Sequence, residues 1–364
     1  MRDPGATAEG THRYEQRFPA GHFRQVCGLS VSTIGLGTYL GEPGEETDRA
    51  YQESVPRAVR MGCNLFDTAI NYRFQRSERS IGLALEKSLQ EGNVSRDELV
   101  ISTKGGFLSF DETHPPNPSR YFDDEFVKTG ICKAEDLVAG CHCLTPAYLE
   151  NQLERSLKNL RVDCIDIYFI HNPETQLAEI SRQDFLKRML AAFKMLERKA
   201  VERKIHVYGA ATWNGFRETA GSPGYLSLEE MIGLAREAGG EEHHFRAIQF
   251  PFNLAMPQAF LRRNQKLGSQ SVSLLEAASR QGMIVLCSAS ILQGQLSRNL
   301  PAFLTDFFSG LRTDAQRAIQ FVRSTPGVTS ALVGMSQLGH VEENLELAKH
   351  LPLSWEQMRN LFEG

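Results

Sequence analysis

The stretch Ile165-Asp166-Ile167-Tyr168-Phe169-Ile170-His171 is apolar at nearly every position, with Asp166 as the exception within its run. A strand with one face in water alternates polar and apolar side chains, so this run indicates a strand that is covered on both faces. Such strands are typical of parallel sheets whose crossover helices pack on both sides. Residues 146–160, which come just before, carry leucines at the spacing of an amphipathic helix.

The same alternation of apolar run and amphipathic segment continues through most of the chain. The candidate strands are Ile34–Thr38, Asn64–Asp67, Leu99–Lys104, Ile165–His171, His206–Thr212, Ala247–Phe250, Ile284–Ser288 and Ser330–Gly334. The amphipathic segments are Thr47–Met61, Ser77–Gln90, Pro146–Leu160, Arg182–Arg203, Ser227–Glu237, Ser271–Gln281, Thr313–Ser324 and His340–His350. Strand–helix units in unbroken alternation predict an α/β fold, a (β/α)8 TIM barrel, rather than an open doubly wound sheet.

A doubly wound dinucleotide-binding sheet would place a glycine-rich turn after its first strand. Gly35-Leu36-Gly37-Thr38 lacks the third glycine and does not open a helix at the required offset. No linker or low-complexity segment divides the chain, so we expect residues 21–364 to form a single barrel domain. Residues 1–20 are mostly polar, and we expect a flexible tail there.

One predicted connection, at about residues 105–145, is far longer than such connections usually are. The connection after a barrel strand lies on the catalytic face, and this one carries several aromatic residues. It is therefore either a cover over a substrate or a structural addition on the barrel rim. It also contains Cys132, Cys141, His142 and Cys143. Their irregular spacing does not match a structural zinc site, so we predict no metal; a redox-sensitive thiol and ordinary loop residues remain as interpretations.

The composition argues against several classes of function. The chain of 364 residues has a net charge of −4 and no block of like charge typical of nucleic-acid or membrane-surface binders. No run approaches the ~18 apolar residues of a membrane span, and the N-terminal residues lack the apolar core of a signal peptide. Seven cysteines, an odd number, indicate a reducing compartment. We therefore predict a cytoplasmic protein that binds neither nucleic acid nor a membrane.

Four polar residues fall at the ends of predicted strands or just beyond them. Asp67 ends one strand, and Tyr72 follows five residues later. Lys104 and His171 end the next two strands. Because the carboxyl ends of the strands in a closed parallel barrel meet at one mouth, these side chains can converge.

The four side chains are chemically complementary. A phenol has a pKa of about 10 and is a poor acid at pH 7, but a nearby ammonium lowers that pKa and a carboxylate holds the ammonium in place. A neutral histidine can orient or polarise a carbonyl oxygen. The set therefore suits proton delivery to an alkoxide. Each residue alone also has a structural explanation, as a helix cap, a rim residue, a solvated cation or a hydrogen-bonded histidine; their joint occurrence on consecutive strands favours catalysis.

The stretch Phe66-Asp67-Thr68-Ala69-Ile70-Asn71-Tyr72, followed by Arg76-Ser77-Glu78 and Gly82, resembles the signature of the aldo-keto reductase family. Further stretches resemble the same family in the right order: Val31–Tyr39, the strand that ends in Lys104, Asp166–Pro173 and Val341–Leu345. The resemblance covers roughly residues 22–350, of which His22–Leu29 resemble the short hairpin that closes the bottom of such barrels.

This resemblance implies roles for the residues. Tyr72 would be the general acid, Lys104 and Asp67 would tune it, and His171 would orient the carbonyl. The family binds an extended nicotinamide cofactor without a Rossmann domain, which implies NADPH here, with NADH as the alternative. The implied cofactor-binding residues are Gly37, Thr38, Tyr39, Asp67, Thr212, Gln249, Cys287, Ser288, Gly334, Met335, Ser336, His340 and Asn344. Those from 334 onward would hold the adenosine end, assisted by the last helix N-terminus.

Three positions depart from the family pattern. The usual Ser-Asn pair beside the carboxamide is replaced, so either Thr212 or Asn214 substitutes for it or the contact is lost. Cys287 stands where an aromatic ring usually stacks on the nicotinamide. The loop from Gly334 to His340 has no Lys or Arg, and a neutral His340 is a weaker partner for a 2′-phosphate than an arginine.

These observations leave three hypotheses for the function. The first is NAD(P)H-dependent reduction of an aldehyde or ketone with Tyr72 as the proton donor. The second is a nicotinamide-binding redox sensor or partner subunit with little turnover, motivated by the altered positions and the long connection. The third, an aldolase that uses Lys104 in a Schiff base, leaves Tyr72 without a role and is the least supported.

Overall fold

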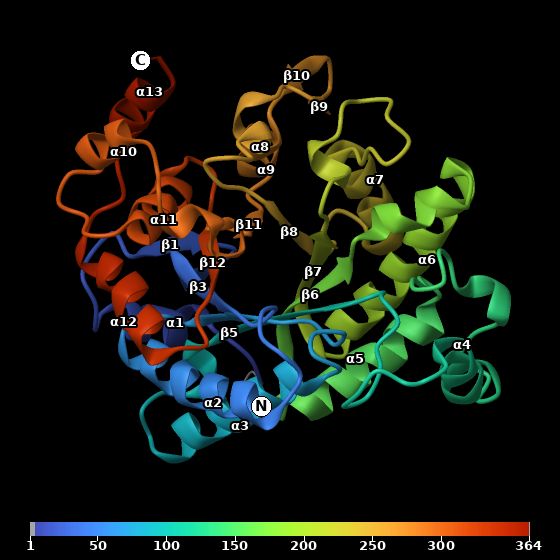
Figure 1. The fold of residues 1–364 in the computed structure, drawn as a ribbon. Helices are drawn as coiled ribbons and strands as arrows, with labels where there is room; N and C mark the ends of the chain where they lie inside the picture. The colour runs from blue at the N-terminus through green and yellow to red at the C-terminus, as the bar shows by residue number, and fades with distance from the viewer. Residues whose placement is uncertain (1–3, 364) are drawn as a thin grey trace.

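The computed structural model describes residues 4–363, and its centre is a closed barrel of parallel strands (Figure 1). The barrel strands are β3 (Ile34–Gly37), β4 (Leu65–Asp67), β5 (Val100–Gly105), β6 (Ile165–His171), β7 (Ile205–Ala211), β8 (Phe245–Pro251), β11 (Ile284–Ser288) and β12 (Ser330–Gly334). Neighbours in sequence are neighbours in the barrel, and β12 pairs with β3 to close it. Closure leaves the barrel itself without an exposed sheet edge.

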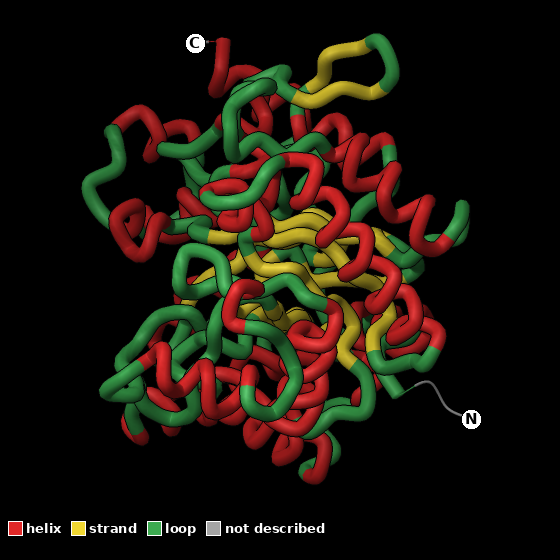
Figure 2. The backbone as a smooth tube through the Cα atoms, turned by 90° about the vertical axis from the view of Figure 1, so that its right-hand side faces the viewer, coloured by secondary structure: helices red, strands yellow, loops and turns green. Residues whose placement is uncertain are grey.

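Helices follow the barrel strands and form the outer layer, so that in Figure 2 the yellow strands of the barrel lie inside a shell of red helices. The helices of this layer are α2 (Glu45–Arg60), α3 (Arg76–Gln90), α5 (Pro146–Leu160), α6 (Arg182–Val201), α7 (Leu228–Gly239), α9 (Leu274–Arg280), α11 (Asp314–Ser324) and α12 (Leu338–Leu345). The predicted (β/α)8 barrel is confirmed, including its long connection after β5. No helix within residues 4–363 is long and apolar enough to cross a membrane.

The strands of the barrel have two buried faces, as the continuous apolar runs predict. Leu65, Val100 and Ile167 belong to a cluster inside the barrel. Their neighbours Phe66 and Ile101 belong to the larger core between barrel and helices. Because side chains alternate across a strand, the position of a residue along its strand decides whether it points to the interior or to the helices.

The bottom of the barrel is closed by a hairpin, as the resemblance implied. Strand β1 (Phe23–Val26) pairs antiparallel with β2 (Leu29–Ser32), and Val31 joins the interior cluster. A second small hairpin, β9 (Gln265–Leu267) with β10 (Gln270–Val272), was not predicted; it projects at the top of Figure 2.

The flexible tail expected at residues 1–20 does not hold for the part that the structure describes. Helix α1 (Ala8–Glu15) begins at Thr7, whose side chain caps it. Its Tyr14 is buried, and the Tyr14 hydroxyl donates to the carbonyl oxygens of Val59 (2.5 Å) and Cys63 (3.1 Å). The buried side chain of Tyr14 therefore anchors this otherwise polar helix to the barrel domain. Residues 1–3 lie outside the described part.

The connection after β5 packs on a core of its own. It contains the short helix α4 (Pro118–Phe122), at the lower right of Figure 1. The buried residues of this core are Leu108, Phe122, Phe126, Cys132, Cys143 and Tyr148. Most of the aromatic residues that suggested a substrate cover therefore pack against each other instead. We refer to residues 106–145 as the insertion.

A buried carboxylate fastens the lower end of β6. Asp166 accepts hydrogen bonds from the backbone N–H groups of Ala6 (2.6 Å) and Ile101 (2.7 Å) and forms ion pairs with Arg96 (2.8 Å) and His206 (3.3 Å). Burial alone would lower the pKa of His206, but its hydrogen bonds to Asp166 and Cys164 outweigh burial and raise that pKa to about 11. The protonated imidazolium is therefore part of the folded state at neutral pH.

This linkage predicts how stability varies with pH. His206 binds its proton more tightly in the folded chain than in the unfolded chain, so its contribution is complete below pH ~6.5 and declines as the pH rises toward about 11. We expect the unfolding free energy, measured by urea denaturation, to fall over this window. His206→Gln should flatten that slope, whereas His12→Gln, at an exposed position of α1, should not. An unchanged slope in His206→Gln would contradict the assignment.

Candidate active site

The carboxyl ends of the barrel strands surround a cavity of about 510 Å³. The cavity is lined by inward-facing residues such as Asp67 of β4, His171 of β6, Gln249 of β8 and Ser288 of β11, together with Tyr72 from the loop after β4. The four predicted catalytic residues are brought together at this mouth: three line the cavity, and Lys104 lies fully buried against them.

Asp67 and Lys104 form an ion pair at the base of the cavity, with a distance of 2.7 Å between Lys104 Nζ and Asp67 Oδ2. Lys104 Nζ also donates to the Thr68 carbonyl oxygen (2.7 Å). The second carboxylate oxygen of Asp67 accepts from Ser102 Oγ (2.7 Å) and from Gln249 Nε2 (2.9 Å). Every polar atom of the pair therefore has a partner, which a buried charge requires.

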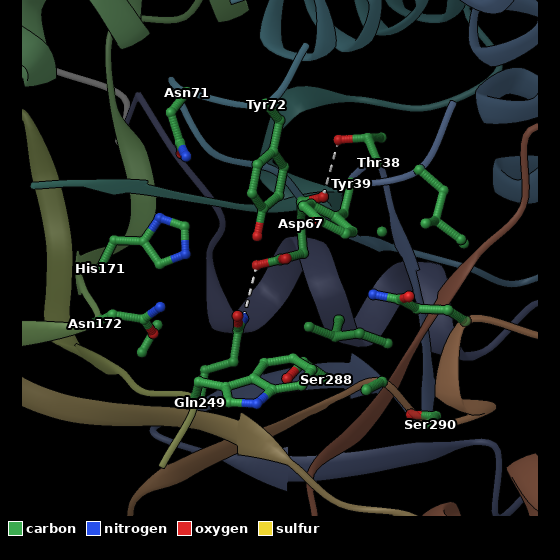
Figure 3. Close-up of a pocket in the computed structure, with 18 of the residues that line it drawn as sticks. Thr38, Tyr39, Asp67, Asn71, Tyr72, His171, Asn172, Gln249, Ser288 and Ser290 are labelled. Atoms are coloured by element: carbon green, nitrogen blue, oxygen red, sulfur yellow. Dashed lines mark hydrogen bonds between the residues drawn. The ribbon is translucent and has the colours of Figure 1, made fainter. Parts of the chain in front are cut away.

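Tyr72 lies above this ion pair, and Figure 3 shows its hydroxyl pointing toward Asp67. Lys104 Nζ is 4.9 Å from the centroid of the Tyr72 ring. The rings of Tyr39 and His171 pack edge-on against Tyr72, with centroid distances of 5.1 and 5.8 Å. The orientation of the phenol is therefore set from several sides.

The backbone after Tyr72 is strained. Arg73, Phe74 and Gln75 all have positive φ, between 46° and 70°, a conformation that costs non-glycine residues of the order of 1 kcal/mol each. Polar contacts hold this turn in place: Arg73 pairs with Asp48 of α2 (2.7 Å), and Gln75 accepts from Asn159 of α5 (3.1 Å). The turn lets the chain pass from Tyr72 directly into α3.

Burial and charge set the protonation states. Burial would lower the pKa of Lys104, but Asp67 more than compensates and raises it, so Lys104 is cationic. Burial raises the pKa of Tyr72 above its usual value despite the opposing effect of Lys104. From the sequence we expected a lowered pKa for Tyr72, and that prediction is wrong because burial outweighs the charge of Lys104. Burial, with the positive charge of Lys104, holds the pKa of His171 well below 6.5, so its imidazole is neutral.

Several of the predicted cofactor-binding residues line the cavity: Gly37, Thr38, Tyr39, Asp67, Thr212, Gln249, Ser288 and Gly334. Of the two candidates for the carboxamide contact, Thr212 lines the cavity, and its backbone N–H donates to the Gln249 carbonyl oxygen (2.8 Å). Its Oγ1 is buried and has no hydrogen-bond partner among the described residues. Asn214 instead accepts from Arg217 (3.1 Å) and does not line the cavity.

Cys287 and Met335 do not reach the cavity. Both side chains are fully buried in the core between barrel and helices. The alternation along β11 explains this: Leu286 and Ser288 face inward, so Cys287 between them faces outward. Cys287 therefore does not stand in for the stacking ring.

The remaining residues expected at the adenosine end, Ser336, His340 and Asn344, lie on α12 or just before it and do not line the cavity. Ser336 is half-buried, and His340 is exposed in the first turn of the helix. Asn344 is buried, and its Oδ1 has no hydrogen-bond partner among the described residues. An orphaned polar atom here is compatible with a bound ligand.

Sequence reasoning missed several residues of the cavity wall. Asn71 and Asn172 line it, and Figure 3 shows both on the same side as His171. Phe107 lines it from the start of the insertion. The adjacency of Asn71 to Tyr72 and of Asn172 to His171 was a usable signal; no pattern distinguished Phe107 from the other aromatic residues nearby. Within residues 4–363 no group of three or more His, Cys, Asp or Glu residues could hold a metal ion.

Comparison with known proteins identifies the family of this chain. The family model described as "Aldo/keto reductase family" matches residues 33–217, which include Asp67, Tyr72, Lys104 and His171. The chain belongs to the aldo/keto reductase family.

Individual relatives of this aldo/keto reductase are distant. "Aldo-keto reductase yakc [NADP(+)]" from Schizosaccharomyces pombe is 27 % identical over 275 residues, which are 75 % of this chain and 60 % of that protein. "NADH-specific methylglyoxal reductase" from Escherichia coli is 30 % identical over 148 residues, which are 39 % of each protein. The match thus spans less than two thirds of either relative. A Klebsiella pneumoniae aldo-keto reductase crystallised with NADPH shares the fold, with a TM-score of 0.64, 18 % identity and 95 % coverage of both chains.

The ion pair leads to a prediction about stability. Lys104→Met would leave the Asp67 carboxylate buried without its cation, and losing one partner of a buried pair costs about 3–5 kcal/mol. We expect that loss in the unfolding free energy measured by urea denaturation. In Lys104→Met combined with Asp67→Asn, the orphaned charge is gone and much of the loss should be recovered. Purely additive effects of the two substitutions would show that the pair is not coupled.

Proposed function

We propose that this aldo/keto reductase family member reduces an aldehyde or ketone with NADPH, and that Tyr72 donates the proton. The observation that carries the proposal is the position of a protonated phenol in one cavity with a neutral imidazole, directly above the buried Asp67–Lys104 pair. A general acid must keep its proton until the substrate needs it, and then release it easily.

The residues meet both requirements. Because burial holds the pKa of Tyr72 above its usual value, the hydroxyl keeps its proton at neutral pH. Lys104 lies close enough to stabilise the phenolate that forms when the proton leaves. The neutral His171 can hydrogen-bond a carbonyl oxygen without competing for the proton. When bound, the reduced nicotinamide supplies the hydride for the carbonyl carbon.

The wall of the cavity fits such a cofactor. Thr212 Oγ1 and the Gln249 amide offer polar groups for a carboxamide, and Thr212 Oγ1 has no other described partner. Gly37 and Gly334 face each other across neighbouring strands and leave the mouth open for an extended ligand. Asn344 and the first turn of α12 would hold the adenosine end. The cofactors in the names of the relatives, NADP(H) and NADH, support the nicotinamide class.

The cavity also indicates which carbonyl compounds fit. Among the described residues that line it, Asp67 alone is charged, and Lys104 neutralises it. Phe107 and Trp213 supply aromatic walls. We therefore propose uncharged aldehydes and ketones as substrates. Lys104 is a poor candidate for a Schiff base because Asp67 raises its pKa and keeps it protonated.

A redox sensor is the second candidate. It is favoured by one observation: the end of β11 presents Ser288 rather than an aromatic ring to the cavity. Without a ring that stacks on the nicotinamide, cofactor binding could persist while turnover is slow. The two candidates differ in turnover and not in binding.

Tyr72→Phe tests the proton donor. Removal of the hydroxyl should lower kcat/KM for uncharged aldehydes by about 10²–10⁴-fold, the usual contribution of general acid catalysis. The affinity for NADPH, measured by quenching of tryptophan fluorescence, should stay unchanged. Turnover is followed by the absorbance of the reduced cofactor.

Tyr121→Phe is the matched control, because it removes a phenol hydroxyl from the insertion at a position that does not line the cavity. Tyr72→Phe with nearly full turnover would exclude Tyr72 as the donor. Wild-type protein that binds NADPH tightly but reduces nothing in a broad carbonyl panel would favour the sensor.

His340→Arg tests the preference between cofactors. His340 is exposed in the first turn of α12, where an arginine could contact a 2′-phosphate in bidentate geometry. A hydrogen bond to a charged group contributes about 1.5–3 kcal/mol, so the Kd for NADPH should fall by about tenfold or more. The Kd for NADH should not change. His350→Arg adds the same charge beyond the helix, and an equal gain in that variant would show a nonspecific charge effect.

A further inference from the structure

The insertion touches the catalytic machinery at His142. We propose that His142 is a positioning residue: it fixes the backbone and the ring of His171, and thereby makes the insertion part of the active site. This proposal rests on the function proposed above, in which His171 orients the substrate carbonyl.

The first contact is a hydrogen bond to the backbone. His142 Nε2 lies 2.7 Å from the carbonyl oxygen of His171, and both residues are buried. A carbonyl oxygen can only accept, so Nε2 carries the hydrogen and Nδ1 is the acceptor. Burial lowers the pKa of His142 to about 4. The imidazole is therefore neutral and held in a single tautomer at neutral pH.

The second contact fixes His142 itself. The side chain of Gln176, on the 3₁₀ turn that follows β6, donates from Nε2 to His142 Nδ1 (3.0 Å) and to the His142 carbonyl oxygen (3.0 Å). Gln176 Oε1 accepts from Arg188 of α6 (2.7 Å). A continuous chain of hydrogen bonds thus runs from α6 to the end of β6, and both ring nitrogens of His142 are used.

The third contact passes through Phe107. Its ring packs edge-on against His142 and edge-on against His171, with a centroid distance of 5.0 Å in each case. Tyr72 packs on His171 as well, at 5.8 Å. His171 Nδ1 is buried without a hydrogen-bond partner among the described residues. The ring of His171 is therefore oriented by aromatic packing and by its backbone rather than by a hydrogen bond at Nδ1.

Gly106 makes room for these contacts. It has a φ of +132°, and a Cβ there would come within 2.9 Å of His142 Nε2 and 3.2 Å of the His171 carbonyl oxygen. A side chain at this position would push the two groups apart. The chain therefore enters the insertion directly beside the hydrogen bond between His142 and the His171 carbonyl oxygen.

His142→Leu and His142→Gln separate positioning from packing. Leucine removes the N–H donor, whereas the glutamine amide can still donate to the His171 carbonyl oxygen. We expect kcat to fall by on the order of 10–100-fold in His142→Leu, because a misplacement of about 1 Å can cost 10²-fold. The Kd for NADPH should not change, and His142→Gln should recover most of the kcat. His114→Leu, at an exposed position of the insertion, is the matched control and should keep the wild-type kcat.

A second readout does not depend on turnover. Two-dimensional ¹H–¹⁵N spectra of the imidazole groups report the environment of His171, whose signals are assigned from a His171→Asn sample. We expect these signals to shift or broaden in His142→Leu and to remain near the wild-type positions in His142→Gln. Gln176→Leu, which removes the amide that hydrogen-bonds His142, should shift them in the same direction. This variant also serves if His142→Leu does not fold.

The outcomes distinguish the two proposals. If wild-type protein reduces no carbonyl compound but the His171 signals respond as expected, the proposed function fails and the positioning role stands. If His142→Leu keeps the wild-type kcat, or its His171 signals do not move, the positioning role is wrong. Equal losses of kcat in His142→Leu and His142→Gln would also overturn it, because they would point to packing alone.

Discussion

The ion pair between Asp67 and Lys104 sits at the base of the cavity, and the rest of the site depends on it. Two charges removed from water are tolerated only when each polar atom finds a partner, and the partners here come from several strands. Lys104 and Ser102 belong to β5, Asp67 to β4, and Gln249 to β8, across the barrel. Closure of the barrel brings β8 opposite β4 and β5, so the fold supplies the Gln249 contact that completes the ion pair.

The same pair governs the chemistry above it. Burial raises the pKa of the Tyr72 phenol, and the positive charge of the Lys104 ammonium offsets part of that increase. The ammonium is available because Asp67 keeps it charged, and its charge also helps to keep His171 neutral. The buried cation thus opposes the effect of burial on the pKa of Tyr72 and adds to the effect of burial on the pKa of His171, and both directions suit the proposed roles.

Patterns along single strands were sufficient to predict the barrel and the convergence of the four polar residues. They were insufficient where orientation mattered. Cys287 was expected at the mouth from its place in the sequence, but alternation along β11 turns it toward the helices. The direction of the pKa shift of Tyr72 depends on how deeply the ring is buried, and sequence periodicity does not report that depth.

The role of His142 could likewise not be predicted from the sequence, because its contacts join segments with no shared pattern. The anchoring of α1 by Tyr14 is a tertiary contact of the same kind.

Strand β6 has a structural residue at its lower end and a cavity residue at its upper end. Asp166 fastens residues 6, 96, 101 and 206 beneath the barrel, while His171, five residues and about 17 Å further on, faces the cavity. The contacts that keep the molecule folded and the groups that meet a ligand are therefore spatially segregated along one rigid element. Loops around the mouth can therefore change in length and sequence without disturbing the contacts of Asp166. Such a chain can acquire new ligands during evolution while its fold stays the same.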